Sequence, residues 1–441
     1  MSQIVPAHDS RRVAVIGGGI AGLSAAWLMG SACRVTVFEA DHRPGGHAHT
    51  VEAFGGVPVD TGFIVYNEPN YPNFTALLAH LGVASQPADM ALSVSLDDGA
   101  FEYSSAALFA QKRNVFSARF WTMLRDVTRF YRHGPRDLPA LETPLVSLDD
   151  YLATKGYCNA FRDDHLLPQA AAIWSTPLAQ IGAYPAAALI RFFQNHGMMQ
   201  VFGRGLWRTV SGGSRAYVGR LLEAIPGEIR LGARIAGIRR AASGVEVRHA
   251  DGRVEVFDEI VLAVHGDTAL ALLDDPTPAE RRILSAFRYS RNQAVLHTDA
   301  GLMPRRRAAW TSWNHIGRRS EPGRGCVTYW MNRLQGLKDA PDLFVTLNPS
   351  RPIAPEAVVH VDQYDHPLFD AAAISAQREL WSLQGRARTW FCGSYFGHGF
   401  HEDALQSGLA VAEALAGVRR PWNVADESGR IHLPPPRERA A

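Results

Sequence analysis

The feature that most constrains the fold lies near the start of the chain, where three glycines follow a short β-branched run in the spacing G-x-G-x-x-G. The run is Val13–Ile16, the glycines are Gly17, Gly19 and Gly22, and a helical segment extends to Met29. In such a strand–turn–helix unit the first glycine permits a tight turn, the second lets the backbone approach a pyrophosphate, and the third lets helix and strand pack closely. The pattern predicts a parallel α/β sheet that binds a dinucleotide.

An acidic residue after the second predicted strand indicates the type of dinucleotide. Arg34–Phe38 reads as that strand, and Glu39 follows it at the expected distance of about 20 residues from the glycines. A carboxylate here accepts hydrogen bonds from ribose hydroxyls and repels a 2′-phosphate, which favours FAD or NAD over NADP. The predicted contacts also include Ile20, Ala21 and Ala40, which flank these residues.

The turn that follows favours FAD. It resembles the R-x-G-G extension of flavin-binding Rossmann proteins, and the resemblance assigns cofactor contacts to Arg43, Gly45, Gly46 and His47. No second G-x-G-x-x-G follows a strand, so the sequence predicts no separate nicotinamide domain. Electrons are then expected to leave the flavin to oxygen or to return to the substrate.

The C-terminal part of the chain gives a second indication of a flavin. Thr389–Cys392 reads as a strand, and a helix is predicted from Glu402 to Ala416. These segments resemble the C-terminal flavin motif of the flavin amine oxidase superfamily, in which the positive helix N-terminus faces the flavin pyrimidine and stabilises its reduced, anionic form. A plain strand–helix connection is the alternative. The resemblance implies cofactor contacts at Gly62, Phe63, Ile64, Ile235, Gly393, Phe400, His401, Asp403 and Ala404.

Nearly the whole chain resembles a bacterial group of FAD-binding, amine oxidase-like proteins. Residues 59–73, 192–197, 329–333 and 400–403 carry the resemblance. It implies an α/β fold in which a Rossmann-type FAD-binding domain is interleaved with an α+β substrate-binding domain. The expected FAD-binding domain comprises residues 1–80, 205–270 and 385–420, the substrate-binding domain comprises 81–204 and 271–384, and 421–441 form a C-terminal tail.

The understood relatives of that group are flavin desaturases of furan fatty acid synthesis and flavin-dependent fatty acid isomerases. The implied activity is dehydrogenation of an unsaturated or methyl-branched long-chain fatty acyl compound, with noncovalent FAD taking hydride at N5. Double-bond isomerisation, amine oxidation and lipid escort without catalysis stay open. Amine oxidation is disfavoured, because many amine oxidases place a lysine beside N5 and the three lysines here lie in no matching strand. The candidate catalytic residues are His401, His196 and Tyr329, although an isolated histidine is more often structural.

Charge and cysteine usage limit the partners. The net charge of +2 provides no global field for nucleic acid, and the four isolated cysteines indicate a reducing cytoplasm without a metal site or disulfide framework. Lys112–Arg136 and Gly301–Gly325 combine arginines with aromatic residues. They predict either a surface for an anionic membrane or an acyl carboxylate, or an ordinary solvated face. We therefore expect a cytoplasmic protein with a lipid substrate, and peripheral contact with the inner face of the membrane is a further hypothesis.

Overall fold

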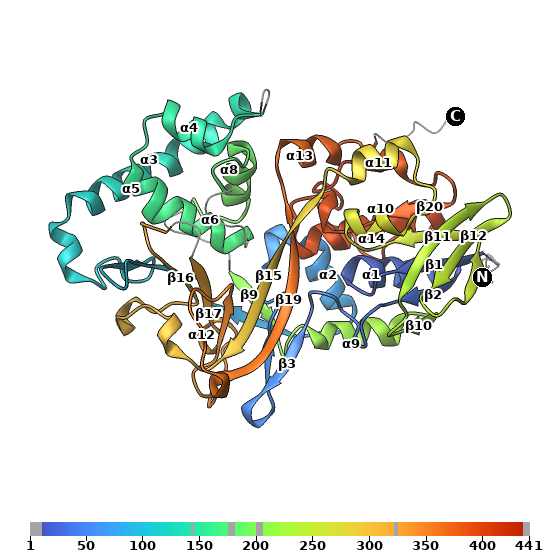
Figure 1. Cartoon of the computed structure of the whole chain (residues 1–441), viewed down its shortest axis with the longest axis horizontal. Helices are drawn as coiled ribbons and strands as arrows, with labels where there is room; N and C mark the ends of the chain where they lie inside the picture. Colours follow the sequence, from blue (N-terminus) through green and yellow to red (C-terminus); the bar gives the residue numbers. More distant parts are fainter. Residues whose placement is uncertain (1–10, 143–144, 175–180, 200–205, 322–324, 435–441) are drawn as a thin grey trace.

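The computed structural model describes residues 11–142, 145–174, 181–199, 206–321 and 325–434, and a five-stranded parallel sheet forms the part that contains the glycine turn (Figure 1). The strand order is β10-β2-β1-β14-β20. The strands are β1 (Arg12–Ile16), β2 (Arg34–Phe38), β10 (Glu228–Arg230), β14 (Glu259–Leu262) and β20 (Thr389–Phe391). β2, which follows β1 in the chain, pairs with one edge of β1, and β14 pairs with its other edge. The strand order thus reverses direction at β1, and open α/β sheets bind ligands at such a switch point.

Both faces of this sheet are covered, which explains why its strands read as continuous apolar runs. Val13 and Val15 of β1 pack in one apolar cluster with helices α1 (Ile20–Met29) and α14 (His401–Ala416). The alternate residues of β1 face an antiparallel meander on the other side. The meander consists of β11 (Ile235–Ala241), β12 (Gly244–His249) and β13 (Val254–Phe257).

A seven-stranded mixed sheet forms the second part of the molecule, in the order β19-β15-β18-β17-β16-β7-β8. All of its strand pairs are antiparallel except that of β16 with β7. Figure 1 shows the long strands β15 and β19 side by side between the two parts of the molecule. The strands are β7 (Leu92–Leu96), β8 (Phe101–Ser104), β15 (Arg288–His297), β16 (Trp313–Gly317), β17 (Cys326–Trp330), β18 (Phe344–Leu347) and β19 (Val358–Leu368).

Smaller elements connect the two parts. Two short sheets contain β3 (Thr50–Ala53), β4 (Val57–Asp60), β5 (Tyr66–Asn67), β6 (Ser85–Ala88) and β9 (Trp207–Val210). The remaining helices are α2 (Pro72–His80), α3 (Ala118–Leu141), α4 (Leu148–Thr154), α5 (Asn159–Phe161), α6 (Leu167–Trp174), α8 (Ala186–Asn195), α9 (Arg215–Ala224), α10 (Gly266–Leu272), α11 (Pro278–Leu284), α12 (Met331–Leu334) and α13 (Ala371–Gln377). No described helix combines the length and the apolar character needed to cross a bilayer.

The predicted fold class is confirmed. In the sequence alone, Arg230–Ile238 reads as a single strand, but in the structure the chain leaves the parallel sheet after β10 and enters the meander at β11. Gly232 turns the chain between them with a φ of +66°, a conformation that glycine adopts without strain. The apolar residues continue through this turn because the parallel sheet and the meander each bury one face.

The C-terminal segment packs on α14. Arg420 is completely buried and pairs with Glu413 at 2.9 Å, and Arg430 pairs with Asp403 at 2.6 Å. Residues 421–434 contain neither a helix nor a strand, so this part of the tail is irregular. Pro435 and Pro436 lie outside the described residues.

Candidate active site

A large cavity opens where the parallel strands end. Its volume is about 560 Å³, which is within the range of ligand and cofactor pockets. Gly17, Glu39, Ala263 and Gly393 line it, and each lies within two residues of the end of a different strand of the parallel sheet. The cavity thus occupies the crevice that the strand order predicts.

The three glycines of the first turn have different structural roles. A Cβ on Gly17, whose φ is +110°, would lie 2.4 Å from the carbonyl oxygen of Ala263, and a Cβ on Gly22 would lie 2.0 Å from that of Gly17. Both positions therefore exclude a side chain because of the fold itself. Gly19 has a φ of −77°, lines the cavity, and would place a Cβ in open space. Open space beside the N-terminus of α1 suits a pyrophosphate, which that helix end attracts.

Glu39 holds this turn in place from the end of β2. Its carboxylate accepts hydrogen bonds from the backbone N–H groups of Gly18 at 2.6 Å and Asp41 at 2.9 Å, and it lines the cavity. The second glycine turn lies against the first, because the Gly45 N–H donates to the Gly18 carbonyl at 2.8 Å. The Arg43 guanidinium donates to the Gly46 carbonyl at 2.8 Å, so it stabilises this second turn.

The N-terminus of α14 faces the same cavity. Phe400, His401 and Ala404 line it, and the Asp403 carboxylate caps the helix by accepting the Phe400 N–H at 2.7 Å. The His401 ring stacks on Phe63 with 3.8 Å between ring centroids and 8° between planes. A helix N-terminus carries partial positive charge, which suits an anionic flavin ring.

Together these features fit FAD. The cavity offers a glycine cradle at one helix N-terminus, a carboxylate at the end of β2 and a second helix N-terminus. Three buried polar atoms on cavity-lining residues, His196 Nε2, Trp313 Nε1 and Tyr395 OH, also have no hydrogen-bond partner among the described residues. Unpaired buried polar atoms are costly in a folded protein unless a bound molecule satisfies them.

The titratable side chains of the lining leave it without a cation at neutral pH. Burial lowers the pKa of every histidine in the lining, to about 3 for His196 and His401 and to about 4 for His366. The pKa of the other three, His47, His265 and His398, is lowered by the same cause. No described lysine or arginine lines the cavity, and its acidic residues are Glu39 and Asp365.

His196 and His401 differ in how their ring nitrogens are used. His196 Nδ1–H donates to the Phe192 carbonyl at 2.9 Å, which leaves Nε2 of this cavity-lining residue as a buried acceptor without a partner among the described residues. His401 Nε2 is instead hydrogen-bonded to the Tyr217 hydroxyl at 2.6 Å. The geometry therefore favours His196 over His401 as a proton acceptor, and gives His401 a stacking role. Tyr329 lines the cavity, and burial raises its pKa, so its hydroxyl stays protonated.

A large part of the cavity wall is apolar and belongs to the second half of the molecule. The wall combines residues of the seven-stranded sheet and of neighbouring helices with a residue of β9 and one that follows β19: Ile173, Phe192, Trp207, Trp313, Tyr329, Leu334, Leu347 and Phe369. The expectation that the arginines of Gly301–Gly325 bind an acyl carboxylate is not supported for this cavity. Arg306, Arg307 and Arg319 instead pair with Glu102, Asp342 and Asp164.

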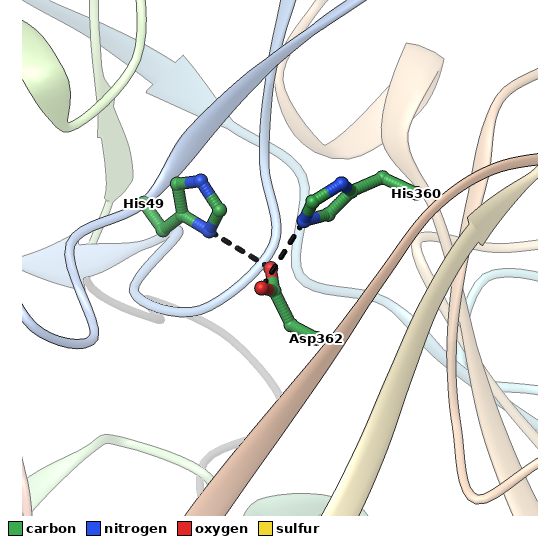
Figure 2. Close-up of side chains that lie close together, drawn as sticks. All are labelled: His49, His360 and Asp362. Carbon is green, nitrogen blue, oxygen red and sulfur yellow. Dashed lines mark hydrogen bonds and ion pairs between the residues drawn. The ribbon is translucent and has the colours of Figure 1, made fainter. Parts of the chain in front are cut away.

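A histidine–carboxylate cluster lies beside the cavity (Figure 2). Asp362 on β19 contacts His49 Nδ1 at 2.8 Å and His360 Nε2 at 3.1 Å, and accepts hydrogen bonds from Thr61 and Tyr364 at 2.8 and 3.1 Å. Two imidazoles and a carboxylate are ligands that zinc accepts, and the three ligand atoms lie within 4.8 Å of one another. The hydrogen bonds of Asp362 with His49, Thr61 and Tyr364 already account for the position of the carboxylate.

The structure places most of the predicted site residues on the cavity wall. The exceptions are Gly22, Arg43 and Asp403, which act one contact away as a packing residue, a turn-stabilising residue and a helix cap. The lining that sequence reasoning missed includes Trp207, Trp313, Tyr364 and His366. Their strands carry no motif, and period-2 alternation alone would have marked only which face is inward.

Fold and site together define the class: an FAD-dependent oxidoreductase. The family described as flavin containing amine oxidoreductase matches residues 20–298, and the chain belongs to that family. Polyamine oxidase 4 of Oryza sativa subsp. japonica is 27% identical over 269 residues, which cover 57% of this chain and 50% of the relative. The human peroxisomal N(1)-acetyl-spermine/spermidine oxidase is 32% identical over 153 residues, which cover 32% of this chain and 28% of the relative. The chain thus aligns with half or less of these curated relatives.

Solved structures show the same fold. A putrescine oxidase variant has a TM-score of 0.69 at 16% identity, with 92% of this chain and 99% of the other covered. A CLA-producing fatty acid isomerase from P. acnes has a TM-score of 0.64 at 17% identity, with 93% and 98% covered. A putative protoporphyrinogen oxidase from Exiguobacterium sp. 255-15 has a TM-score of 0.67 at 16% identity, with 93% and 99% covered. At these identities the similarity concerns the fold alone.

Proposed function

We propose that this oxidoreductase dehydrogenates an unsaturated or methyl-branched long-chain acyl compound. The observation that carries the proposal is the cavity wall: aliphatic and aromatic side chains line it, and no described lysine or arginine does. A hydrocarbon chain gains about 0.8 kcal/mol for each CH₂ it buries in such surroundings. The four cysteines are unpaired, which agrees with the cytoplasmic location that we propose.

The chemistry needs one hydride acceptor and one proton acceptor. When bound, FAD supplies a two-electron acceptor for the hydride that leaves one carbon of the substrate. The neighbouring carbon loses a proton, and the electron pair left behind forms the new double bond. His196 Nε2 is the unpartnered acceptor in the lining, and we assign the proton to it. Because burial lowers the pKa of His196 to about 3, the imidazolium that forms releases this proton to solvent water.

Amine oxidation is the second candidate. The two polyamine oxidases among the relatives favour it, and Asp365 in the lining could pair with an ammonium group. Against it, no described lysine lines the cavity, whereas many amine oxidases of this superfamily have one beside the flavin. Isomerisation is a third candidate, which the fold shared with a fatty acid isomerase keeps open. Lipid escort without catalysis needs no FAD, and the cradle for FAD argues against it.

Anaerobic mixing of the purified holoenzyme with candidate substrates tests these alternatives. Lasting loss of the oxidised flavin absorbance with an unsaturated acyl compound, and none with putrescine or spermidine, would support dehydrogenation. A retained oxidised spectrum together with a moved double bond would support isomerisation instead. Rapid reduction by an amine, with no response to any acyl chain, would refute the acyl proposal. A protein that cannot be loaded with FAD would support the escort function.

A further inference from the structure

An unusual concentration of exposed apolar side chains lies between residues 108 and 121, in the turns that precede α3 and in the first turn of that helix. Phe116 is 91% exposed and Trp121 is 50% exposed, and three further apolar side chains of this surface, Leu108, Phe109 and Val115, are 41–43% exposed. Single exposed apolar residues are common on proteins, but five within fourteen residues need an explanation. We call these five residues the apolar tip. In Figure 1 it lies at the edge of the molecule, away from the parallel sheet.

The apolar tip is held by buried polar side chains, so its exposure is a fixed feature of the fold. Gln111 donates to the Ala100 carbonyl at 3.1 Å, and Asn114 donates to the Glu102 carbonyl at 2.8 Å; both residues are at least 97% buried. The Trp121 indole N–H donates to the Val115 carbonyl at 2.8 Å. With its N–H satisfied, the exposed ring of Trp121 presents mainly apolar surface.

Basic residues surround the apolar tip and continue along α3. Residues 105–136 contain seven lysines and arginines and one acidic residue, Asp126. Asp126 is buried and pairs with Arg125 and Arg129. Exposed cations without an ion pair among the described residues are Lys112, Arg113, Arg132 and Arg136. Trp121, Arg125, Arg132 and Arg136 follow one another at intervals of four and seven residues, so they share one face of the helix.

We propose that the apolar tip and this basic face of α3 dock the protein on the surface of an anionic membrane. A protruding aromatic ring beside lysines and arginines is the arrangement by which interfacial helices enter the headgroup region. Each basic residue near an anionic surface contributes about fivefold in affinity. A protein partner would ordinarily match such a tip with acidic residues of its own, and that alternative is an outcome of the test. The proposal depends on the surface alone and stands apart from the reaction catalysed.

Co-sedimentation of the FAD-loaded full chain with vesicles tests the proposal. We expect binding to vesicles of phosphatidylglycerol and phosphatidylethanolamine, and at least tenfold weaker binding to phosphatidylcholine vesicles. Phe116→Ser should reduce binding to the anionic vesicles about tenfold, and Lys112→Glu with Arg132→Glu should reduce it at least as much. Phe54→Ser is the matched control, because Phe54 is 53% exposed in the short turn between β3 and β4 and should leave binding unchanged.

Three results would overturn the proposal. Wild-type protein that stays in the supernatant with anionic vesicles would do so, as would Phe116→Ser protein that binds as tightly as the wild type. If Phe116→Ser instead changes the elution volume in gel filtration and leaves vesicle binding unaffected, the apolar tip is a protein–protein interface. Unchanged flavin content in every variant shows that the fold is intact. None of these measurements requires turnover, so failure of the acyl-substrate proposal would not affect them.

Discussion

Gly19 and Gly22 allow the FAD cradle to be tested by two substitutions that add the same methyl group three residues apart. A Cβ at Gly19 would meet no atom within 4 Å, and the backbone there already has a φ of −77°, which alanine adopts freely. Gly19→Ala should therefore change the free energy of unfolding of the FAD-free protein by less than about 1 kcal/mol. Alanine restricts the unfolded chain, which stabilises the protein by about 0.4–1 kcal/mol, but it is less favourable than glycine at the N-cap of α1. The new methyl group would nevertheless project into the space assigned to the pyrophosphate, so FAD binding should fall sharply.

For Gly22→Ala we expect the folded protein itself to be destabilised. Its Cβ would lie 2.0 Å from the Gly17 carbonyl oxygen and 3.0 Å from the Cβ of Ala263, so α1 would have to move away from the parallel sheet. Overpacking of a core typically costs about 1–3 kcal/mol and occasionally more, and a clash with backbone belongs at the upper end. Gly22→Ala should therefore lower the unfolding midpoint in urea, and lose FAD as a consequence.

The assay measures two quantities for each variant: the ratio of flavin to protein after gel filtration, and the urea midpoint of the FAD-free protein. We expect Gly19→Ala to lower the flavin content and leave the urea midpoint unchanged. Gly22→Ala should lower both the flavin content and the urea midpoint. Gly219→Ala in α9 serves as a control for both, because its Cβ would also meet no atom within 4 Å and Gly219 does not line the cavity. Full flavin content in Gly19→Ala protein would show that the pyrophosphate does not lie beside this residue.

Four further predictions concern the same site. Glu39→Ala should weaken FAD binding about 30–150-fold, or about 2–3 kcal/mol, whereas Glu52→Ala at an exposed position should not. Equal FAD affinity of the two variants in fluorescence titrations would remove Glu39 from the ribose site. FAD should separate from the denatured chain, because burial raises the pKa of the Cys392 thiol and keeps it unreactive; flavin that stays attached after denaturation would contradict this. His196→Gln should slow flavin reduction about 10²–10⁴-fold at unchanged flavin content, and a rate equal to that of the His133→Gln control would refute its role. The free energy of unfolding should fall between about pH 7.5 and about pH 5. Each histidine with a pKa near 3 lowers it by about 2 kcal/mol, because the unfolded chain takes up a proton below pH 6.5 and the folded protein does not, whereas Asp60, with a pKa near 6, raises it by about 1 kcal/mol. Equal urea midpoints at the two pH values would contradict this.

The parts of the fold that sequence predicts are those where local chemistry allows few alternatives. The strand–turn–helix around Gly17 and the helix from Glu402 to Ala416 were predictable because a strained turn and a capped helix leave direct signatures in sequence. α14 differs from the prediction by one residue, starting at His401. The two strands within 230–238 were not separable, because both bury apolar residues and only Gly232 marks the turn between them.

The substrate side of the cavity was less accessible to sequence reasoning, because it is assembled from residues distant in the chain. Trp207 and Trp313 come from different sheets and meet the cavity only through tertiary packing. The arginines of Gly301–Gly325 suggested a carboxylate site, but sequence does not show which charges are already paired. Arg319 contacts Asp97 and Asp164, which lie more than 150 positions away.

The electrostatics of the lining determine how a lipid substrate would be oriented. Moving an unpaired carboxylate from water into a protein interior costs several kcal/mol, and the lining offers neither a described lysine or arginine nor a histidine that is charged at neutral pH. A carboxylate end would therefore stay near solvent while the hydrocarbon part enters. An ester carbonyl could instead accept a hydrogen bond from Trp313 Nε1–H, which has no partner among the described residues. This orientation keeps the polar end of the substrate at the surface of the protein, which is also where the headgroup of a membrane lipid has to remain.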